Sequence, residues 1–217
     1  MGTDWKDLAD SAKSRSEIYG LLTTVFREEP TEAFIMELKG PRLSGALSGM
    51  GVTLGDEFSN ESEAQLTEAL VLEFTQLFIG PDRHISAHES VFVEAVGGAG
   101  GLWGEKTVEV KAFIETTGLD YAKEFTGVPD HISVELEFMQ KLTEWEADKW
   151  NQEDRENAEY CQIVQRKFLE RHLLSWTPQF CDSVMNQAKM TFYSSMADLT
   201  KNFMEFERQS IATDSAA

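Results

Sequence analysis

The stretch that most constrains the fold runs from Pro129 to about Trp150. A proline and an Asp-His pair open it, and its apolar residues follow at intervals of three and four: Ile132, Leu136, Met139, Leu142 and Trp145. This spacing places the apolar side chains on one face of an α-helix. We therefore predict a long amphipathic helix that must bury this face against other helices.

The Asp130–His131 pair at the start of this helix has two interpretations. In the first, Asp130 is the N-cap, because its carboxylate can accept hydrogen bonds from the free N–H groups of the first turn. In the second, Asp130 orients His131 at the mouth of a pocket, where the imidazole donates a hydrogen bond to a ligand or changes charge near neutral pH. Capping and binding do not exclude each other, so both interpretations stay open.

Helical spacing continues along most of the chain. The expected helices cover residues 14–29, 31–39, 60–79, 105–117, 131–150, 157–169, 177–188 and 192–206, with a short helix and a loop in 41–60. A capping box at Ser14–Glu17 and a Thr177–Pro178 start signal support two of them. Residues 82–92 are interpreted as an ordered loop, and only residues 90–96 resemble a strand, with no nearby partner.

The expected fold class is therefore all-α, a globular multi-helix bundle. We predict an N-terminal helical part over 1–118, a hinge-like connector around 119–130, a C-terminal helical part over 131–209 and a frayed tail over 210–217. The connector would also permit the exchange of halves between two chains, so a monomer and a domain-exchanged dimer are both open.

Charge and hydropathy limit the classes of partner. The chain has 38 acidic and 19 basic residues, a formal net charge of −19. Such a surface repels nucleic acid and anionic membranes and favours a basic peptide or protein segment, although the excess could also serve only to keep the protein in solution. There is no apolar run near the roughly 20 residues that span a bilayer and no signal-peptide pattern. A cytoplasmic location without stable membrane insertion is expected.

No residue pattern predicts catalysis, a metal or a cofactor. His84 and His88 would share a face only on a helix, and Gly80–Pro81 just before them favours a loop. The stretch Gly98–Thr107 resembles a phosphate-binding loop, but Glu105 separates its last glycine from Lys106. Cys161 and Cys181 have no metal-ligand spacing and no activating basic neighbour, so we expect reduced, buried thiols. The weakest hypothesis is an enzyme that uses His131 as a general base.

Three segments, in the same order, resemble the TorD/DmsD/NarJ family of cytoplasmic chaperones for molybdenum-containing redox enzymes. They are Glu73–Pro81 followed by His88–Phe92, then Pro129–Met139, and then Phe168–Phe180. Their family counterparts are a Leu-Phe-x-Gly-Pro helix end with a Glu-Ser-Val-aromatic loop, a Pro-Asp-His segment, and a Phe-Leu, His-Leu, Trp, Pro and Phe pattern. The chain departs from many relatives at Ser86–Ala87, where they carry prolines, which leaves the subgroup open.

The resemblance implies an all-helical, TorD-like chaperone without a cofactor of its own. Its partners would be the apo form of the catalytic subunit of a molybdopterin-dependent oxidoreductase, the twin-arginine leader of that subunit and, further, molybdenum-cofactor biosynthesis proteins. It would hold the subunit for cofactor insertion before export or membrane assembly.

The implied peptide-binding residues are Leu77, Phe78, Gly80, Pro81, His88, Glu89, Ser90, Val91, Phe92, Pro129, Asp130, His131 and Glu135. For Leu77 and Phe78 the alternative is that they are simply core, and we assign Trp176 to packing. The alternative function is binding or slow hydrolysis of a guanine nucleotide, supported only by the glycine-rich residues 97–101 and Lys106.

Overall fold

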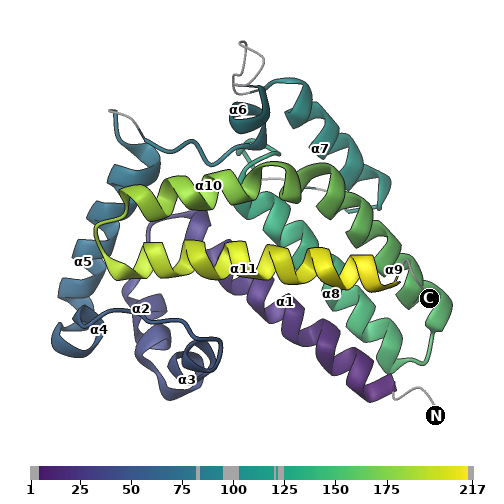
Figure 1. Ribbon diagram of the computed structural model, residues 1–217, viewed down its shortest axis with the longest axis horizontal. Coiled ribbons are helices and arrows are strands. Elements are labelled where there is room, and N and C mark those ends of the chain that lie inside the picture. The colour runs from purple at the N-terminus through teal and green to yellow at the C-terminus, as the bar shows by residue number, and fades with distance from the viewer. Residues whose placement is uncertain (1–4, 82–83, 95–102, 120, 122–124, 215–217) are drawn as a thin grey trace. The chain divides into compact units, whose positions relative to one another are not determined.

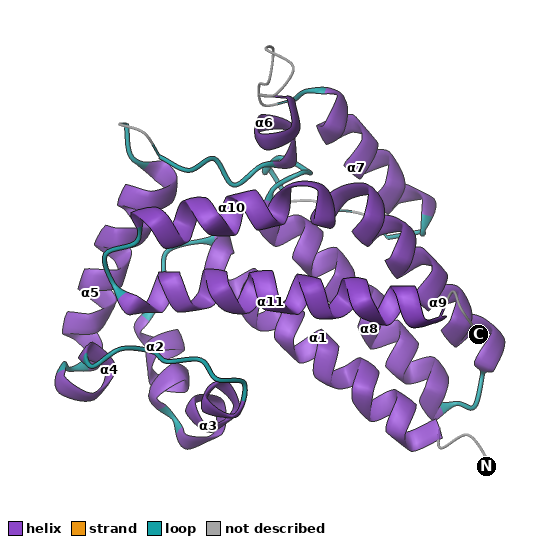
Figure 2. Ribbon diagram, in the orientation of Figure 1, coloured by secondary structure: helices purple, strands orange, loops and turns teal. Residues whose placement is uncertain are grey.

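The computed structural model describes residues 5–81, 84–94, 103–119, 121 and 125–214. Within these ranges the regular structure is helical, apart from one antiparallel β-bridge between His88 and His131 (Figures 1 and 2). The all-α class predicted from the sequence is confirmed.

The α-helices are α1(Trp5–Arg27), α2(Glu32–Lys39), α3(Pro41–Gly49), α4(Glu57–Asn60), α5(Glu63–Phe74), α6(Glu89–Glu94), α7(Glu105–Thr116), α8(Ile132–Asn151), α9(Arg155–Phe168), α10(Leu174–Gln187) and α11(Thr191–Asp214). Two π-helical segments, η1(Thr75–Ile79) and η3(Leu169–Leu173), directly follow α5 and α9. α11 is longer than the sequence indicated and extends into the expected frayed tail as far as Asp214, while residues 215–217 lie outside the described ranges.

The described chain forms two compact units. Unit 1 contains residues 5–27, 88–177 and 207–214, and unit 2 contains residues 28–87 and 178–206, so α10 and α11 each contribute to both. This division differs from the expected boundary at 119–130. α7 and α8 flank that connector but belong to the same unit, and the Thr107 hydroxyl of α7 donates a hydrogen bond to Asp130 just ahead of α8. Residues 120 and 122–124 of the connector lie outside the described ranges.

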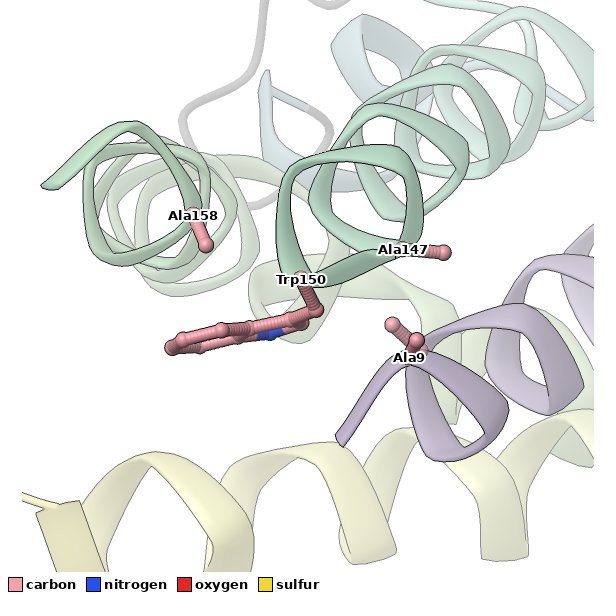
Figure 3. Packing of buried hydrophobic residues seen from close by; sticks show 5 residues of the cluster. Ala9, Ala147, Trp150 and Ala158 are labelled. Atoms are coloured by element: carbon pink, nitrogen blue, oxygen red, sulfur yellow. The ribbon is translucent and has the colours of Figure 1, made fainter. Parts of the chain in front are cut away.

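The core of unit 1 forms where α1 and α9 pack against α8. α1 and α8 lie side by side along their length (Figure 1). At one end the Trp150 indole lies beside the small side chains of Ala9, Ala147 and Ala158, which come from three different helices (Figure 3). Small residues let the helix backbones approach closely and leave room for the large ring, so the ring and the three alanines are buried together.

A buried ionic network joins α1, α8, α9 and α11 within unit 1. The Arg15 guanidinium donates to both carboxylate oxygens of Glu207, each at 2.7 Å. It also donates to Glu146 Oε2 at 3.0 Å and to Gln165 Oε1 at 2.6 Å. The Tyr19 hydroxyl donates to Glu207 at 2.9 Å. Burial by itself lowers the pKa of Arg15, but the hydrogen bond to Glu207 and its charge outweigh this effect and raise it.

The expected helix start at Ser14–Glu17 is wrong, since α1 is already helical from Trp5. Inside the helix the Ser14 hydroxyl donates to the Asp10 carbonyl. The turns before Ser14 bury Ala9 and Ala12 against Trp150 and Ala158. Tertiary packing of these small residues extends the helix through a pattern that, taken locally, resembles a start.

α5 and η1 in unit 2 agree closely with expectation. Ser62 is the N-cap and forms a full capping box with Gln65, and the helical path ends at Gly80. Its buried face carries Leu66, Leu70, Phe74 and Leu77. The aromatic rings of Phe74, Phe78, Phe180 and Tyr193 contact one another in the core of this unit.

The expected N-cap at Thr177 is wrong, because α9, η3 and α10 form one uninterrupted helical path in which Pro178 is internal. Pro178 lacks the N–H that would bond to the carbonyl of Leu174, four residues earlier. That carbonyl lies where the π-helical turn gives way to α-helix, so the hydrogen-bond pattern is already changing there. Residues 90–94, which resembled a strand, belong to the short helix α6.

Candidate peptide-binding site

The predicted site residues divide between the two units. Unit 2 contains Leu77, Phe78, Gly80 and Pro81. Unit 1 contains His88, Glu89, Ser90, Val91, Phe92, Pro129, Asp130, His131 and Glu135. Each group is described within its own unit.

In unit 1 the structure joins two segments that lie about 40 residues apart in the chain. His88 and His131 form the antiparallel bridge, and the Glu89 N–H donates to the Asp130 carbonyl at 3.0 Å. The two imidazole rings meet edge to face, with centroids 4.9 Å apart. This junction places the starts of α6 and α8 next to each other, which no local sequence signal indicated.

Asp130 caps a different helix from the one expected. Its Oδ2 accepts from the Ser90 N–H in the first turn of α6 at 2.8 Å, and its Oδ1 accepts from the Thr107 hydroxyl of α7 at 2.9 Å. The N-cap of α8 is instead His131, whose Nδ1 accepts from the Ser133 N–H at 3.2 Å. The first interpretation of the pair is therefore corrected: the aspartate, which is fully buried, ties α6 and α7 to the residue before α8.

Glu89 forms a buried pair with His172, a residue outside the predicted set. His172 Nδ1 lies 2.8 Å from Glu89 Oε2, and both side chains are completely enclosed. The Ser175 hydroxyl approaches the other Glu89 oxygen at 3.4 Å. The only sequence signal for this role was a histidine on the apolar face of a helix that also buries Phe168 and Leu173. That pattern does not identify the partner.

Glu135 is a third fully buried carboxyl group in this region. Its Oε2 accepts from the Trp176 indole N–H at 3.4 Å, while its Oε1 has no hydrogen-bond partner among the described residues. Burial raises the pKa of Glu135 well above its ordinary value, and the negative charges of Glu89 and Asp130 raise it further. Trp176 is thus more than a packing residue, since its N–H supports a buried acid.

The Glu135→Gln variant is expected to remove a pH-dependent loss of stability. Because the folded-state pKa of Glu135 lies above the unfolded value of about 4.5, its contribution to stability is complete below pH 4.5. That contribution is lost progressively as the pH rises towards the folded-state pKa. Glutamine keeps an acceptor for Trp176 and does not titrate. Urea unfolding at pH 5 and pH 8 should show that the variant gains stability relative to the wild type at the higher pH.

The matched control is Glu137→Gln, on the same helix but about half exposed beside Arg27. Its stability relative to the wild type should change little between the two pH values, because water solvates that carboxylate in both the folded and the unfolded chain. Identical pH profiles for the Glu135 and Glu137 variants would contradict the assignment of Glu135 as a protonated, buried acid.

His131 is poised to donate a hydrogen bond rather than to change charge. Burial, and next the neighbouring His88, lower its pKa to about 4, so the ring is neutral at physiological pH. Since Nδ1 accepts from Ser133, the neutral ring carries its proton on Nε2. The structure therefore favours the hydrogen-bonding part of the second interpretation over charge switching near pH 7.

The apolar members of the predicted set are partly core. Val91 and Phe92 on α6 are half-buried, and the Phe92 ring lies 5.6 Å from the ring of Trp176. In unit 2, Leu77 is buried and Phe78 is half-buried within the aromatic cluster, while Pro81 is exposed. A core role therefore accounts for Leu77, whereas Val91, Phe92 and Phe78 keep surface that a ligand could contact.

The remaining patterns add no chemical site among the residues that the structure describes. No group of three His, Cys, Asp or Glu side chains there is arranged to hold a metal ion. The glycine-rich residues 97–101 lie outside the described ranges, and Lys106 pairs with Glu109 at 2.8 Å. Cys161 and Cys181 are free and buried, as predicted, and burial raises the pKa of Cys181 to about 12. Across the same described ranges, no helix could cross a membrane.

Comparison with known proteins gives the family. The sequence profile described as nitrate reductase delta subunit matches residues 41–182, well over half of the chain. The chain belongs to this family. The chaperone protein TorD of Photobacterium profundum is 29% identical to it over 210 residues, covering 90% of this chain and 93% of that one. TorD of Vibrio atlanticus is 24% identical over 221 residues, covering 95% and 99%.

A solved structure shares the fold of this family member. The crystal structure of a putative redox enzyme maturation protein from Archaeoglobus fulgidus superimposes with a TM-score of 0.56 at 23% sequence identity, covering 88% of this chain and 93% of that one. The family resemblance predicted from the sequence is confirmed. Because the relatives are chaperones, the coarse role is that of a chaperone rather than an enzyme.

Proposed function

We propose that the protein binds the twin-arginine leader and the apo form of the catalytic subunit of a molybdopterin-dependent oxidoreductase, and holds it for cofactor insertion before export or membrane assembly. The observation that carries this proposal is the His88–His131 junction, which sets a neutral imidazole donor beside the half-buried apolar side chains of α6. The chaperone relatives and the nitrate reductase name of the family support a redox-enzyme client.

Each part of a leader peptide has a counterpart in this arrangement. Its main-chain carbonyls can accept from the Nε2–H of His131, and its apolar centre can contact Val91 and Phe92. Its basic start is attracted by the formal charge of −19, which speeds encounter and favours cationic partners. Cofactor-biosynthesis proteins remain a predicted further partner.

The buried acids would act on the leader indirectly. Glu89, Asp130 and Glu135 have no exposed surface, and each accepts hydrogen bonds from within unit 1. A leader arginine would have to displace these internal partners to reach them. We therefore assign the three acids a positioning role, in which they hold the starts of α6 and α8 so that the imidazoles keep their places.

Calorimetric titration with a synthetic twin-arginine leader tests the proposal. The His131→Asn variant is expected to bind the leader about five- to tenfold more weakly, which corresponds to the loss of one hydrogen bond of about 1 kcal/mol. Asparagine is itself a good N-cap, so the stability of α8 should be nearly unchanged. His131→Ala, which also removes the cap, should lose similar affinity and about 1 kcal/mol of stability.

A twin-lysine leader and a scrambled basic peptide, each measured at two salt concentrations, provide the peptide controls. Binding that discriminates the leader from the scrambled peptide and persists in salt supports a specific site. Equal binding of all three peptides that disappears in salt would mean that net charge is the whole effect, and the leader proposal would fail.

A further inference from the structure

One face of α5 and η1 in unit 2 carries an acidic, a hydroxyl and two aliphatic side chains at the surface. Glu68, Leu72, Thr75 and Ile79 follow one another at steps of four, three and four, so they share a face of the helical path. Leu72 and Ile79 are each 59% exposed, although they flank the helix end whose other face forms the core. We call these four residues the α5 stripe.

A second acid extends the stripe from the chain just ahead of α2. The Thr75 hydroxyl donates to Glu29 Oε1 at 2.8 Å, which holds that carboxylate at Thr75, the stripe residue that lies between Leu72 and Ile79 along the helical path. The other end of α2 is attached to the start of α5, because Lys39 donates to the Glu61 carbonyl at 2.7 Å. The helix pair therefore fixes both Glu29 and Glu68 next to exposed aliphatic surface.

The charge around the stripe is not balanced locally. Residues 28–76 contain ten acidic and two basic side chains. One of the two bases, Lys39, is already paired with Glu63. The other base is Arg42, and at the end of this range Lys189 donates a hydrogen bond to Gln76. Exposed aliphatic groups within a stretch of such acidic excess match a segment that is both basic and apolar, and they disfavour an anionic lipid surface.

We propose that the α5 stripe and Glu29 form a docking surface for the basic N-terminal part of the client leader. This inference rests on the proposed function, from which it takes the leader as the occupant, and the surface itself lies wholly within unit 2. Guanidinium groups would pair with Glu29 and Glu68, while aliphatic side chains of the leader would cover Leu72 and Ile79.

Two double variants and a control test this surface by calorimetry with the twin-arginine leader. Leu72→Ser with Ile79→Ser should weaken binding about tenfold, because exposed apolar anchors are lost without disturbing the core. Glu29→Gln with Glu68→Gln should weaken binding about fivefold and make it less sensitive to salt. The control, Glu17→Gln with Glu156→Gln, makes the same change of net charge on exposed residues of unit 1 and should change affinity less than about twofold.

A leader in which both arginines are replaced by glutamine completes a double-variant cycle. The wild type and the Glu29→Gln, Glu68→Gln variant should bind this leader equally, because it has no arginines to pair with the two glutamates. If both stripe variants bind the leader as tightly as the control does, the docking surface is refuted while the proposed function stands. If the wild type does not bind the leader at all, the docking surface and the proposed function are both refuted. Loss of a self-associated species from the stripe variants in sedimentation would show a second copy as the occupant and overturn the proposal.

Discussion

The Arg15→Met variant is expected to lose about 3–5 kcal/mol of unfolding free energy. Arg15 is the one cation in the described network that pairs with both Glu146 and Glu207, and each of these carboxylates is almost fully buried. Methionine fills similar space but leaves two buried negative charges without compensation. Urea unfolding followed by circular dichroism measures the loss, which would be a large part of the stability of a typical domain.

Arg27→Met is the matched control for this prediction. It lies on the same helix and also pairs with a glutamate of α8, but both side chains are more than 40% exposed, so the cost should stay below about 1 kcal/mol. Adding Glu207→Gln to the Arg15 variant should restore part of the stability by removing one uncompensated charge. Equal losses in the Arg15 and Arg27 variants would show that the buried network does not hold unit 1 together.

The second large effect is expected for Asp130→Ala, at about 2–4 kcal/mol. The variant removes the acceptor of both the Ser90 N–H and the Thr107 hydroxyl in a fully buried place and leaves a small void. Hydrogen exchange provides a local readout, because the Ser90 amide should lose protection before the rest of unit 1 does. Leader affinity should fall as well, since the positions of His88 and His131 depend on this cap.

Asp130→Asn separates the geometry of the cap from its charge. Asparagine retains an oxygen for the Ser90 N–H and an amide group that can face the Thr107 hydroxyl, so the expected loss is only about 1 kcal/mol. An alanine variant with wild-type stability and a protected Ser90 amide would refute the capping role. A variant that loses leader binding while remaining fully stable would instead indicate direct contact between Asp130 and the peptide.

The sequence predicted which residues belong to the candidate site better than it predicted how they are arranged. Short motifs pointed to Glu89, Asp130 and His131, and the structure brings these three together in unit 1. The partners that give them their roles, His172 and Thr107, were not predicted. Both are ordinary residues on helical faces, and only the packing of α6, α7 and η3 makes them hydrogen-bond partners of the acids.

The all-α class, the helical path of α5 and η1 from about residue 60 to Gly80, the buried thiols and the family were all predictable from the sequence. These features depend on apolar spacing, on caps and breakers within four residues, or on short motifs, all of which can be read along the chain. The packed structure was needed to show that α1 begins before Ser14, that Pro178 is internal and that Asp130 caps α6. Those outcomes depend on burial and on pairings between residues distant in sequence, such as Arg15 with Glu207. No local pattern encodes which distant residue will exclude water from a given side chain and complete its hydrogen bonds.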